Sequence, residues 1–210
     1  MEALVPFAAD RPKTRLADVL SSAERRSFAA AMLTDVLAAV RGAGHTPVVV
    51  TTAPLERDAA QVVDERPLGE AVDGLLAARE PDHDSPLAVV MADLALATPS
   101  ALTRLTAPPD DGPADLVFAP GLGGGTNAVV VRDARFRTDY HGVSIGDHRA
   151  LARELGASVR EVDSRLLATD VDTPADLAEL LVHGDGAARD WLEDAGFELD
   201  TSGGRVTVDR

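Results

Sequence analysis

The chain has 210 residues, of which 45% are hydrophobic but only 3% aromatic, and this predicts one α/β domain with a core of Ala, Val and Leu. A formal net charge of −15 argues against nucleic-acid binding, which requires a basic surface. No apolar run approaches the roughly 18–20 residues of a membrane helix. The absence of cysteine excludes disulfides and thiolate metal sites, so carboxylates are the expected metal ligands.

The surface charge and the first residues indicate where the protein works. Lys13 is the only lysine among 20 basic residues, and an acidic surface poor in lysine is typical of proteins adapted to high salt. A basic partner is the alternative explanation of the acidity. Residues 1–6 carry neither the basic segment nor the cleavage site of a signal peptide, so we expect a cytoplasmic location.

The first elements follow the order strand, loop, helix, strand. Residues 4–8 predict a short buried strand, which a polar and basic loop follows. Ser21 and Glu24 have the spacing of a capping box at the start of a helix, and this helix should end near Gly42. A second strand is expected at 47–51. Apolar strands joined in this way are typical of a mostly parallel sheet covered by helices on both faces.

The same pattern continues to residue 182. Further strands are expected at 87–91, 116–118, 128–131 and 159–162, and further helices at 68–78, after Thr98-Pro99, at 147–155 and after Thr173-Pro174. Residues 191–210 predict the end of a helix and a hairpin around Ser202-Gly203-Gly204. We therefore expect a single domain over 1–210, with a core at 4–182 and a C-terminal extension at 183–210.

Four segments carry side chains suited to chemistry, and they should meet beyond the carboxyl ends of the strands, where open α/β sheets bind ligands. The first is the loop after the first strand, with Arg11, Lys13 and Arg15. Three positive charges at alternate positions can hold a triphosphate. The alternative is a solvated basic loop.

Carboxylates form the second and third segments. Asp93 ends an apolar strand, and Asp170 and Asp172 face one side of an extended stretch just before a helix. Asp93 with one or both of this pair would give a site of oxygen ligands for Mg²⁺. The alternative is that these acids only close a turn or favour the positive end of a helix.

The fourth segment is the glycine-rich turn that ends in Gly125, Thr126 and Asn127. Glycines let the backbone approach a ligand and direct N–H groups at an anion. The spacing matches neither a Walker loop nor a Rossmann fingerprint, and a plain hairpin turn is the alternative. Downstream, the loop at 140–145 could close over a small substrate. His148 is too isolated along the chain to be assigned as a ligand.

Taken in order, these segments resemble the 2-phospho-L-lactate guanylyltransferase family of coenzyme F-420 biosynthesis, in a haloarchaeal-type form. The resemblance spans residues 4–182. The matching runs are Lys13-Thr14-Arg15-Leu16, residues 31–37, Ala92-Asp93-Leu94, Gly124-Gly125-Thr126-Asn127 and Asp170-Val171-Asp172-Thr173-Pro174-Ala175-Asp176-Leu177. Asp-Val-Asp-Thr-Pro also occurs in related sugar and molybdenum-cofactor nucleotidyltransferases, so the ordered set carries the resemblance.

The resemblance implies a GT-A-like, Rossmann-related nucleotidyltransferase fold and a homodimer. It implies that GTP and 2-phospho-L-lactate give lactyl-2-diphospho-5'-guanosine and pyrophosphate; related enzymes use phosphoenolpyruvate or 3-phosphoglycerate. Leu68-Gly69-Glu70-Ala71 stands where the family often has Leu-Asn-x-Ala, and Gly142-Val143-Ser144 stands for Gly-Pro-x-Ser. The base and the register of the second loop therefore stay open.

The expected chemistry is in-line attack of an acceptor phosphate oxygen on the α-phosphorus of the nucleotide. This oxygen is already anionic, so the protein supplies position and charge rather than a general base. The expected roles are Mg²⁺ binding by Asp93, Asp172 and Asp170, neutralisation of the leaving pyrophosphate by Lys13, Arg11 and Arg15, and acceptor binding by Gly125, Thr126, Asn127, Gly142 and Ser144.

Other functions remain open at this point. One is a related transferase that uses a sugar phosphate or a molybdopterin, although the latter would need a glycine-rich loop where residues 9–15 contain no glycine. Another is a non-catalytic module that binds a nucleotide, and a third is a purely structural domain. As an enzyme, the protein could hand its product over to a downstream transferase.

Overall fold

The computed structural model describes residues 1–10, 12–57, 59–109, 112–204 and 206–210. The elements in chain order are β1 (Glu2–Phe7), the 3-10 helix η1 (Thr14–Leu16), α1 (Ser22–Gly42), β2 (Thr46–Thr51), β3 (Gln61–Val63), α2 (Leu68–Arg79), β4 (Leu87–Val90), α3 (Pro99–Thr106), β5 (Leu116–Pro120), β6 (Thr126–Val131), α4 (Ser144–Leu155), β7 (Val159–Glu161), α5 (Arg165–Ala168), α6 (Pro174–His183), α7 (Ala187–Asp194), β8 (Glu198–Asp200) and β9 (Thr207–Asp209).

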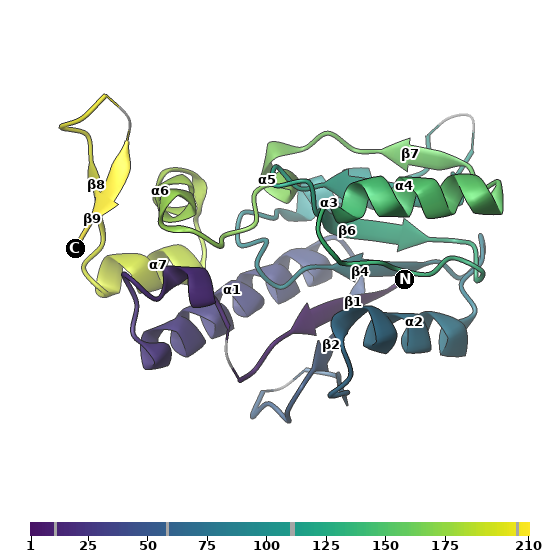
Figure 1. The fold of residues 1–210 in the computed structure, drawn as a ribbon, viewed down its shortest axis with the longest axis horizontal. Helices are drawn as coiled ribbons and strands as arrows, with labels where there is room; N and C mark the ends of the chain where they lie inside the picture. The colour runs from purple at the N-terminus through teal and green to yellow at the C-terminus, as the bar shows by residue number, and fades with distance from the viewer. Residues whose placement is uncertain (11, 58, 110–111, 205) are drawn as a thin grey trace.

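Among the described residues, seven strands form one sheet in the order β3-β2-β1-β4-β6-β5-β7 (Figure 1). All neighbouring strands are parallel except β6, which runs antiparallel to β4 and β5. The mostly parallel sheet flanked by helices is thus confirmed. Because β1, β2 and β4 are parallel, their carboxyl ends meet at one edge, and the reversed β6 begins at that same edge.

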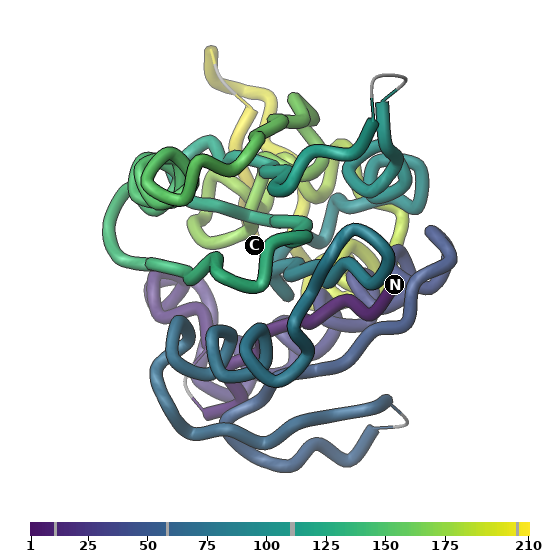
Figure 2. Tube along the Cα trace, turned by 90° about the vertical axis from the view of Figure 1, so that its right-hand side faces the viewer, coloured from purple at the N-terminus to yellow at the C-terminus, as the bar shows by residue number. Residues whose placement is uncertain are grey.

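Helices cover both faces of the sheet, as Figure 2 shows with α2 and α4 on one side and α3 on the other. The core between α1, α3 and the sheet includes Leu33, Leu37 and Leu102. The core on the opposite face includes Leu76 and Phe118. Two buried layers explain why the strands read as continuous apolar runs. No helix in the described part of the chain is long and apolar enough to cross a membrane.

The first helix forms as the sequence predicts. The Ser21 side chain accepts the N–H of Glu24, and the Glu24 carboxylate accepts the N–H of Ser21 at 2.8 Å, so both halves of the capping box are present. At its other end, Gly42 lets α1 approach α3, because a Cβ there would lie 2.7 Å from Cγ of Pro99.

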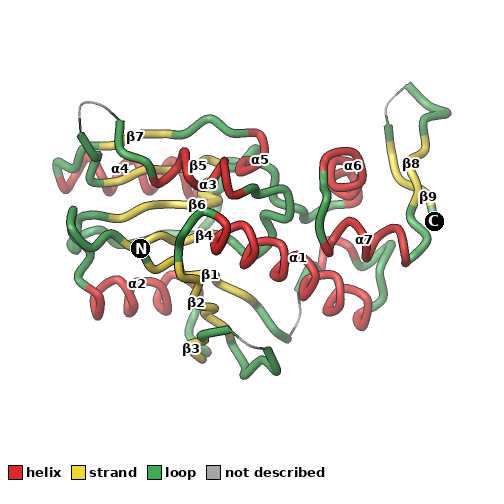
Figure 3. Tube along the Cα trace, turned by 180° about the vertical axis from the view of Figure 1, so that it is seen from behind, coloured by secondary structure: helices red, strands yellow, loops and turns green. Residues whose placement is uncertain are grey.

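The C-terminal extension packs against the amino-terminal half of α1 and forms one end of the molecule (Figures 1 and 3). Trp191 of α7 lies with its ring centroid 5.1 Å from that of Phe28. The predicted hairpin is present as β8 and β9, which pair antiparallel from Glu198 to Asp209.

Some features differ from the expected elements. The strand β3 and the four-residue helix α5 were not predicted, because each is too short to show a period of its own. Helix α4 begins at Ser144 rather than at residue 147, since no capping side chain marks its start.

Candidate active site

Lys13 follows β1 and adopts a left-handed backbone conformation, with φ 52° and ψ 47°. Its side chain is directed inward and is only 8% exposed. The ammonium nitrogen Nζ lies 2.8 Å from Oδ2 of Asp93 and 2.6 Å from Oδ1 of Asp172. One lysine therefore joins two carboxylates that lie far apart in the sequence.

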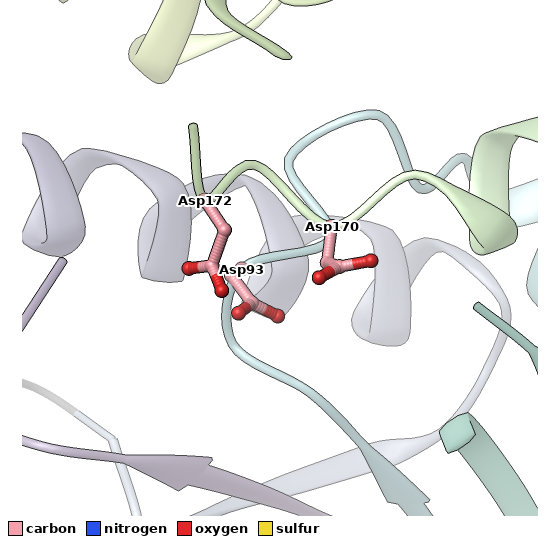
Figure 4. A group of neighbouring side chains, drawn as sticks. All are labelled: Asp93, Asp170 and Asp172. Atoms are coloured by element: carbon pink, nitrogen blue, oxygen red, sulfur yellow. The ribbon is translucent and has the colours of Figure 1, made fainter. Parts of the chain in front are cut away.

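Asp93, Asp170 and Asp172 form a carboxylate cluster (Figure 4), in which one oxygen of each lies within 4.8 Å of the others. Asp170 and Asp172 extend from one loop, and Asp93 comes from the segment after β4. Oδ1 of Asp93 is buried and has no hydrogen-bond partner among the described residues. A buried carboxylate oxygen without a partner is costly unless a ligand completes it. These oxygen donors fit a hard divalent cation.

Local hydrogen bonds hold the loop that carries Asp170 and Asp172. The N–H of Val171 donates to the carbonyl oxygen of Asp93 at 3.1 Å, which ties this loop to the end of β4. The carboxylate of Asp176 accepts the N–H of Asp172 at 3.1 Å and that of the next residue at 2.7 Å. Asp176 is the third residue of α6, so the predicted helix start also positions the cluster.

The charges of the cluster are coupled. Burial raises the pKa of Asp170, and the negative charge of Asp93 adds to this effect. For Lys13, burial acts to lower the pKa, but the carboxylates of Asp93 and Asp172 outweigh it, so the pKa of Lys13 is raised. The ammonium group therefore stays charged. One cation among three carboxylates leaves the cluster able to accept further positive charge.

A cavity of about 480 Å³ lies beside the cluster, beyond the carboxyl ends of β1, β2 and β4. Lys13, Asp93 and Asp172 line it, as do Asp64 and Arg66, which form an ion pair of 2.6 Å. The other lining residues are mainly apolar and are Pro6, Phe7, Ala8, Pro12, Ala29, Met32, Val50, Thr51, Thr52, Pro67, Leu68, Ala71, Met91 and Ala92. A small-molecule site commonly combines apolar walls with a few convergent charged groups.

The glycine-rich turn lies beside the cluster because β6 runs antiparallel to β4. The N–H of Met91 donates to the carbonyl oxygen of Asn127 at 3.0 Å. The side-chain Nδ2 of Asn127 donates to Oδ1 of Asp170 at 3.3 Å and to the carbonyl oxygen of Leu167 at 2.9 Å. Gly121 leaves room for this amide, since a Cβ there would meet Oδ1 of Asn127. Asn127 thus orients one member of the cluster.

The remaining acceptor-side residues lie on two adjoining segments. Thr126 and Ser144 are each only 4% exposed, and the N–H of Thr126 donates to Oγ of Ser144 at 2.9 Å. Gly125 is half-buried, whereas Gly142 is exposed and has a φ of 57°. Ser144 is the first residue of α4. That these residues bind an acceptor stays a prediction.

The basic loop contributes Arg15 to the edge of the cluster. Arg15 is 72% exposed, and its Nη1 lies 3.1 Å from Oδ2 of Asp172. Arg11 lies outside the described residues. The structure thus brings Lys13, Arg15 and the three aspartates together at one edge of the sheet.

His148 is the residue that sequence reasoning set aside and the structure places next to Thr126. Its ring is fully buried, and its Nδ1 lies 2.8 Å from Oγ1 of Thr126. The signal was the spacing of four residues between Ser144 and His148, which puts both side chains on one face of a helix.

A mostly parallel sheet with a lysine, a carboxylate cluster and a cavity at the carboxyl ends of its strands is the arrangement that the sequence predicts for a nucleotidyltransferase. Comparison with protein families points to the same class, because residues 1–210 match the family described as "Guanylyl transferase CofC like". The chain belongs to this family.

Individual relatives agree with the family assignment. The chain is 58% identical over 210 residues to the 2-phospho-L-lactate guanylyltransferase of Haloarcula marismortui, covering all of this chain and 99% of that protein. A nucleotidyl transferase from Methanothermobacter thermautotroptrophicus is 14% identical with a TM-score of 0.56, over 92% of this chain and 98% of the other. A protein of Desulfovibrio desulfuricans assigned to the nucleotide-diphospho-sugar transferases is 15% identical, with a TM-score of 0.68 over 92% and 94%. These two structures show the fold alone.

Proposed function

We propose that this protein transfers the GMP unit of GTP to the phosphate of 2-phospho-L-lactate and releases pyrophosphate. The observation that carries the proposal is the pairing of Lys13 with Asp93 and Asp172 in the lining of a cavity of about 480 Å³. Membership of the family and the similarity to the 2-phospho-L-lactate guanylyltransferase of Haloarcula marismortui support the same reaction. The proposal thus specifies GTP as the donor and 2-phospho-L-lactate as the acceptor.

The carboxylate cluster would hold a divalent cation, which we propose is Mg²⁺. Asp93, Asp170 and Asp172 offer the hard oxygen donors that Mg²⁺ prefers, and the buried Oδ1 of Asp93 is the donor that lacks a partner. A bound Mg²⁺ supplies positive charge against the phosphate oxygens as charge builds in the transition state.

The protein's own groups then position the reactants and balance their charge. Lys13 and Arg15 face the cluster from the loop after β1 and would neutralise the departing pyrophosphate. Asn127 holds Asp170 in place from the other side. The acceptor phosphate oxygen attacks the α-phosphorus, a P–O bond forms as the bond to pyrophosphate breaks, and no proton needs to be removed.

One assay tests donor and acceptor together. GTP and ATP are each combined with 2-phospho-L-lactate, phosphoenolpyruvate, 3-phosphoglycerate and a sugar phosphate in a high-salt buffer, and pyrophosphate and the nucleotide product are measured. We expect the highest kcat/KM for GTP with 2-phospho-L-lactate. A higher value with another acceptor would change the assigned substrate, and tight GTP binding without any turnover would contradict the enzyme itself.

Asp93→Asn tests the metal role of Asp93, because it keeps the shape of the side chain and removes its charge. We expect pyrophosphate release to fall by about 10²–10³-fold, the usual effect of losing one electrostatic contact in a site that excludes water. Near-normal release by this variant, folded as judged by circular dichroism, would contradict the metal role of Asp93.

Four further expectations belong to this proposal. The protein would work in the cytoplasm as a homodimer and as one domain. Its product is an activated diphosphate that a downstream transferase would take over directly. Sedimentation at working salt concentration tests the dimer, and a sedimentation coefficient of a monomer at assay concentrations would contradict it.

A further inference from the structure

His148 is a buried titratable group that the proposed reaction does not use. It lies on α4 with no exposed surface. Its ring stacks on Phe118, with centroids 6.0 Å apart and an interplanar angle of 12°. The rings of Phe136 and Tyr140 meet it edge-on at 5.7 and 5.2 Å. An imidazole enclosed by three aromatic rings has no access to solvent, so its hydrogen bonds within the protein decide its state.

Both ring nitrogens have a partner, and together the partners fix one tautomer. The backbone N–H of Asp139 points at Nε2 of His148 at 2.8 Å. A backbone N–H can only donate, so Nε2 must accept and carries no proton. The neutral ring therefore holds its proton on Nδ1. This Nδ1–H donates to Oγ1 of Thr126 at 2.8 Å.

The hydroxyl of Thr126 is oriented by these contacts. It accepts from His148 and, at 3.4 Å, from the Oγ–H of Ser144. With two donors on its oxygen, the Thr126 hydroxyl has only its own proton left to offer. That proton donates to no described residue. The arrangement leaves one buried O–H free to bind an oxygen of a ligand.

His148 also links two segments that are separate in the sequence. Thr126 begins β6 next to the carboxylate cluster, and Asp139 lies in the loop that leads through Gly142 to α4. We propose that His148 is a positioning residue for the acceptor: it joins these two segments and directs the Thr126 hydroxyl at an anionic oxygen of the bound phosphorylated acid. This inference rests on the proposed function, because it needs an acceptor at this end of the site.

Protonation would break the link. Burial lowers the pKa of His148, against the charges of Asp139, Asp147 and Asp73, which act to raise it; Tyr140 faces the ring as a neutral group. A proton on Nε2 would turn its acceptor into a donor and oppose the N–H of Asp139. Acceptor binding should therefore weaken as the pH falls below the ordinary histidine value of about 6.5.

Two substitutions separate the two hydrogen bonds. His148→Gln places an amide near the position of Nε2 and can still accept from Asp139, but it loses the donor to Thr126. His148→Asn places its amide near Nδ1 and retains that donor. We expect His148→Gln to raise the acceptor KM by roughly tenfold, the effect of one buried hydrogen bond. His148→Asn should raise it less, and neither should change the KM for GTP.

A double-mutant cycle tests whether His148 acts through Thr126. Thr126→Val removes the hydroxyl and keeps the branched shape, so it should raise the acceptor KM alone. If the proposal holds, adding His148→Gln to Thr126→Val raises the KM no further. Additive effects would overturn it, because a merely structural histidine has no reason to depend on that hydroxyl.

The pH profile gives a second readout. The acceptor phosphate titrates near pH 6 itself, so the informative quantity is the ratio of the acceptor KM of wild type to that of His148→Gln. This ratio should rise as the pH falls. The corresponding ratio of the KM values for GTP should not change with pH. Nitrogen NMR shifts of His148 should show a proton on Nδ1 at neutral pH, and a proton on Nε2 would overturn the proposal.

His45 provides the matched control. It also pairs with a threonine hydroxyl, at 3.1 Å from Oγ1 of Thr106, but precedes β2 at the edge of the sheet opposite the cluster. His45→Gln should leave both KM values unchanged. An unchanged acceptor KM and pH ratio in His148→Gln would overturn the positioning role. Absence of turnover in the wild type would instead overturn the proposed function, and this inference with it.

Discussion

Lys13 combines two features that are each unusual in a folded protein. A left-handed backbone conformation is uncommon outside glycine and costs of order 1 kcal/mol. A nearly buried ammonium group requires close anions, which Asp93 and Asp172 supply. The backbone strain at this position is offset by placing the only lysine of the chain between two carboxylates of the site.

The same contacts predict how the cluster responds to metal. Lys13→Gln removes the cation between Asp93 and Asp172, so the remaining carboxylates repel one another in metal-free protein. We expect the free energy of unfolding to fall by about 1–3 kcal/mol in a chelating buffer. Added Mg²⁺ should restore stability by binding the folded state. Thermal unfolding of wild type and variant, with chelator and with Mg²⁺, measures both effects.

Arg15→Gln is the control for this experiment. Arg15 also contacts Asp172, but it is 72% exposed, and exposed ion pairs contribute little. Its Mg²⁺ response should therefore match that of wild type. Equal stabilisation of Lys13→Gln and wild type by Mg²⁺ would show that the lysine and the metal do not share the cluster.

Single residues could be predicted where their position followed from strand order. The sequence could place three carboxylates at one edge of the sheet, because each follows or precedes a regular element whose direction the sequence indicates. These are Asp93, Asp170 and Asp172. The surroundings of Thr126 could not be predicted in this way. Its partner His148 comes from a helix whose start has no capping side chain, so nothing in the sequence placed that face against β6.

At the scale of elements, the carboxylate of Asp35 is one of the groups that hold the C-terminal extension to α1. Oδ1 and Oδ2 of Asp35 accept the N–H groups of Ala187 and Ala188 at 2.7 and 2.8 Å. These are N–H groups of the first turn of α7, which have no partner within the helix. Gly186 makes the approach possible, because a Cβ there would overlap the Asp35 carboxylate.

Asp35→Ala should therefore loosen α7. We expect a loss of about 1–2 kcal/mol in the free energy of unfolding, the usual cost of removing a helix cap. Urea unfolding followed by the fluorescence of Trp191 measures it. Asp35→Asn, which keeps one acceptor oxygen, should lose less. Equal stability of wild type and Asp35→Ala would mean that the packing of α7 alone holds the extension.

A second carboxylate joins the starts of β5 and β7. Oδ2 of Asp115 accepts both the N–H and the hydroxyl of Ser158 at 2.7 Å, and these bonds lower the pKa of Asp115 to about 2. The pKa in the unfolded chain is about 3.9. A carboxyl group whose pKa is lower when folded stabilises the protein above its unfolded pKa, and this contribution disappears as the pH falls from about 4 to about 2.

Asp115→Asn should accordingly lose stability near neutral pH, by about 1 kcal/mol, and the difference from wild type should shrink as the pH falls below about 4 and vanish only below about 2. Unfolding experiments at several acidic pH values measure this. His83 also contacts Asp115, with Nε2 2.8 Å from Oδ1. A difference that stays constant across the window would contradict the assigned role.

Elements with their own sequence pattern were predicted well, and those that depend on neighbours were not. The helix α1 has a capping box and a full apolar face, and its start agrees with the structure. The strand β3 has three residues, two of them exposed, and exists because β2 offers it an edge. No local pattern can reveal such a strand, since its stability comes from pairing.

At the scale of the whole molecule, the lengths of the connections explain which strand directions could be derived from the sequence. The unit β1-α1-β2 has a crossover helix, so its strands had to be parallel. The connection between β5 and β6 is a short glycine-rich turn, which makes that pair antiparallel and brings Thr126 to the edge where β4 ends. The sequence showed both strands and the turn, but their place between β4 and β7 depends on long-range packing.

The net charge predicts how the whole molecule responds to salt. With 35 acidic and 20 basic residues, the surface repels itself, and this repulsion opposes the compact state. Salt screens it, because the Debye length falls from about 10 Å at 0.1 M to about 3 Å at 1 M. We expect Tm to rise steeply with KCl up to about 1 M and then level off, as followed by circular dichroism. Sulfate should continue to raise Tm beyond that point, since it also strengthens apolar burial, and a Tm that stays flat in KCl would mean that the acidic surface does not limit stability.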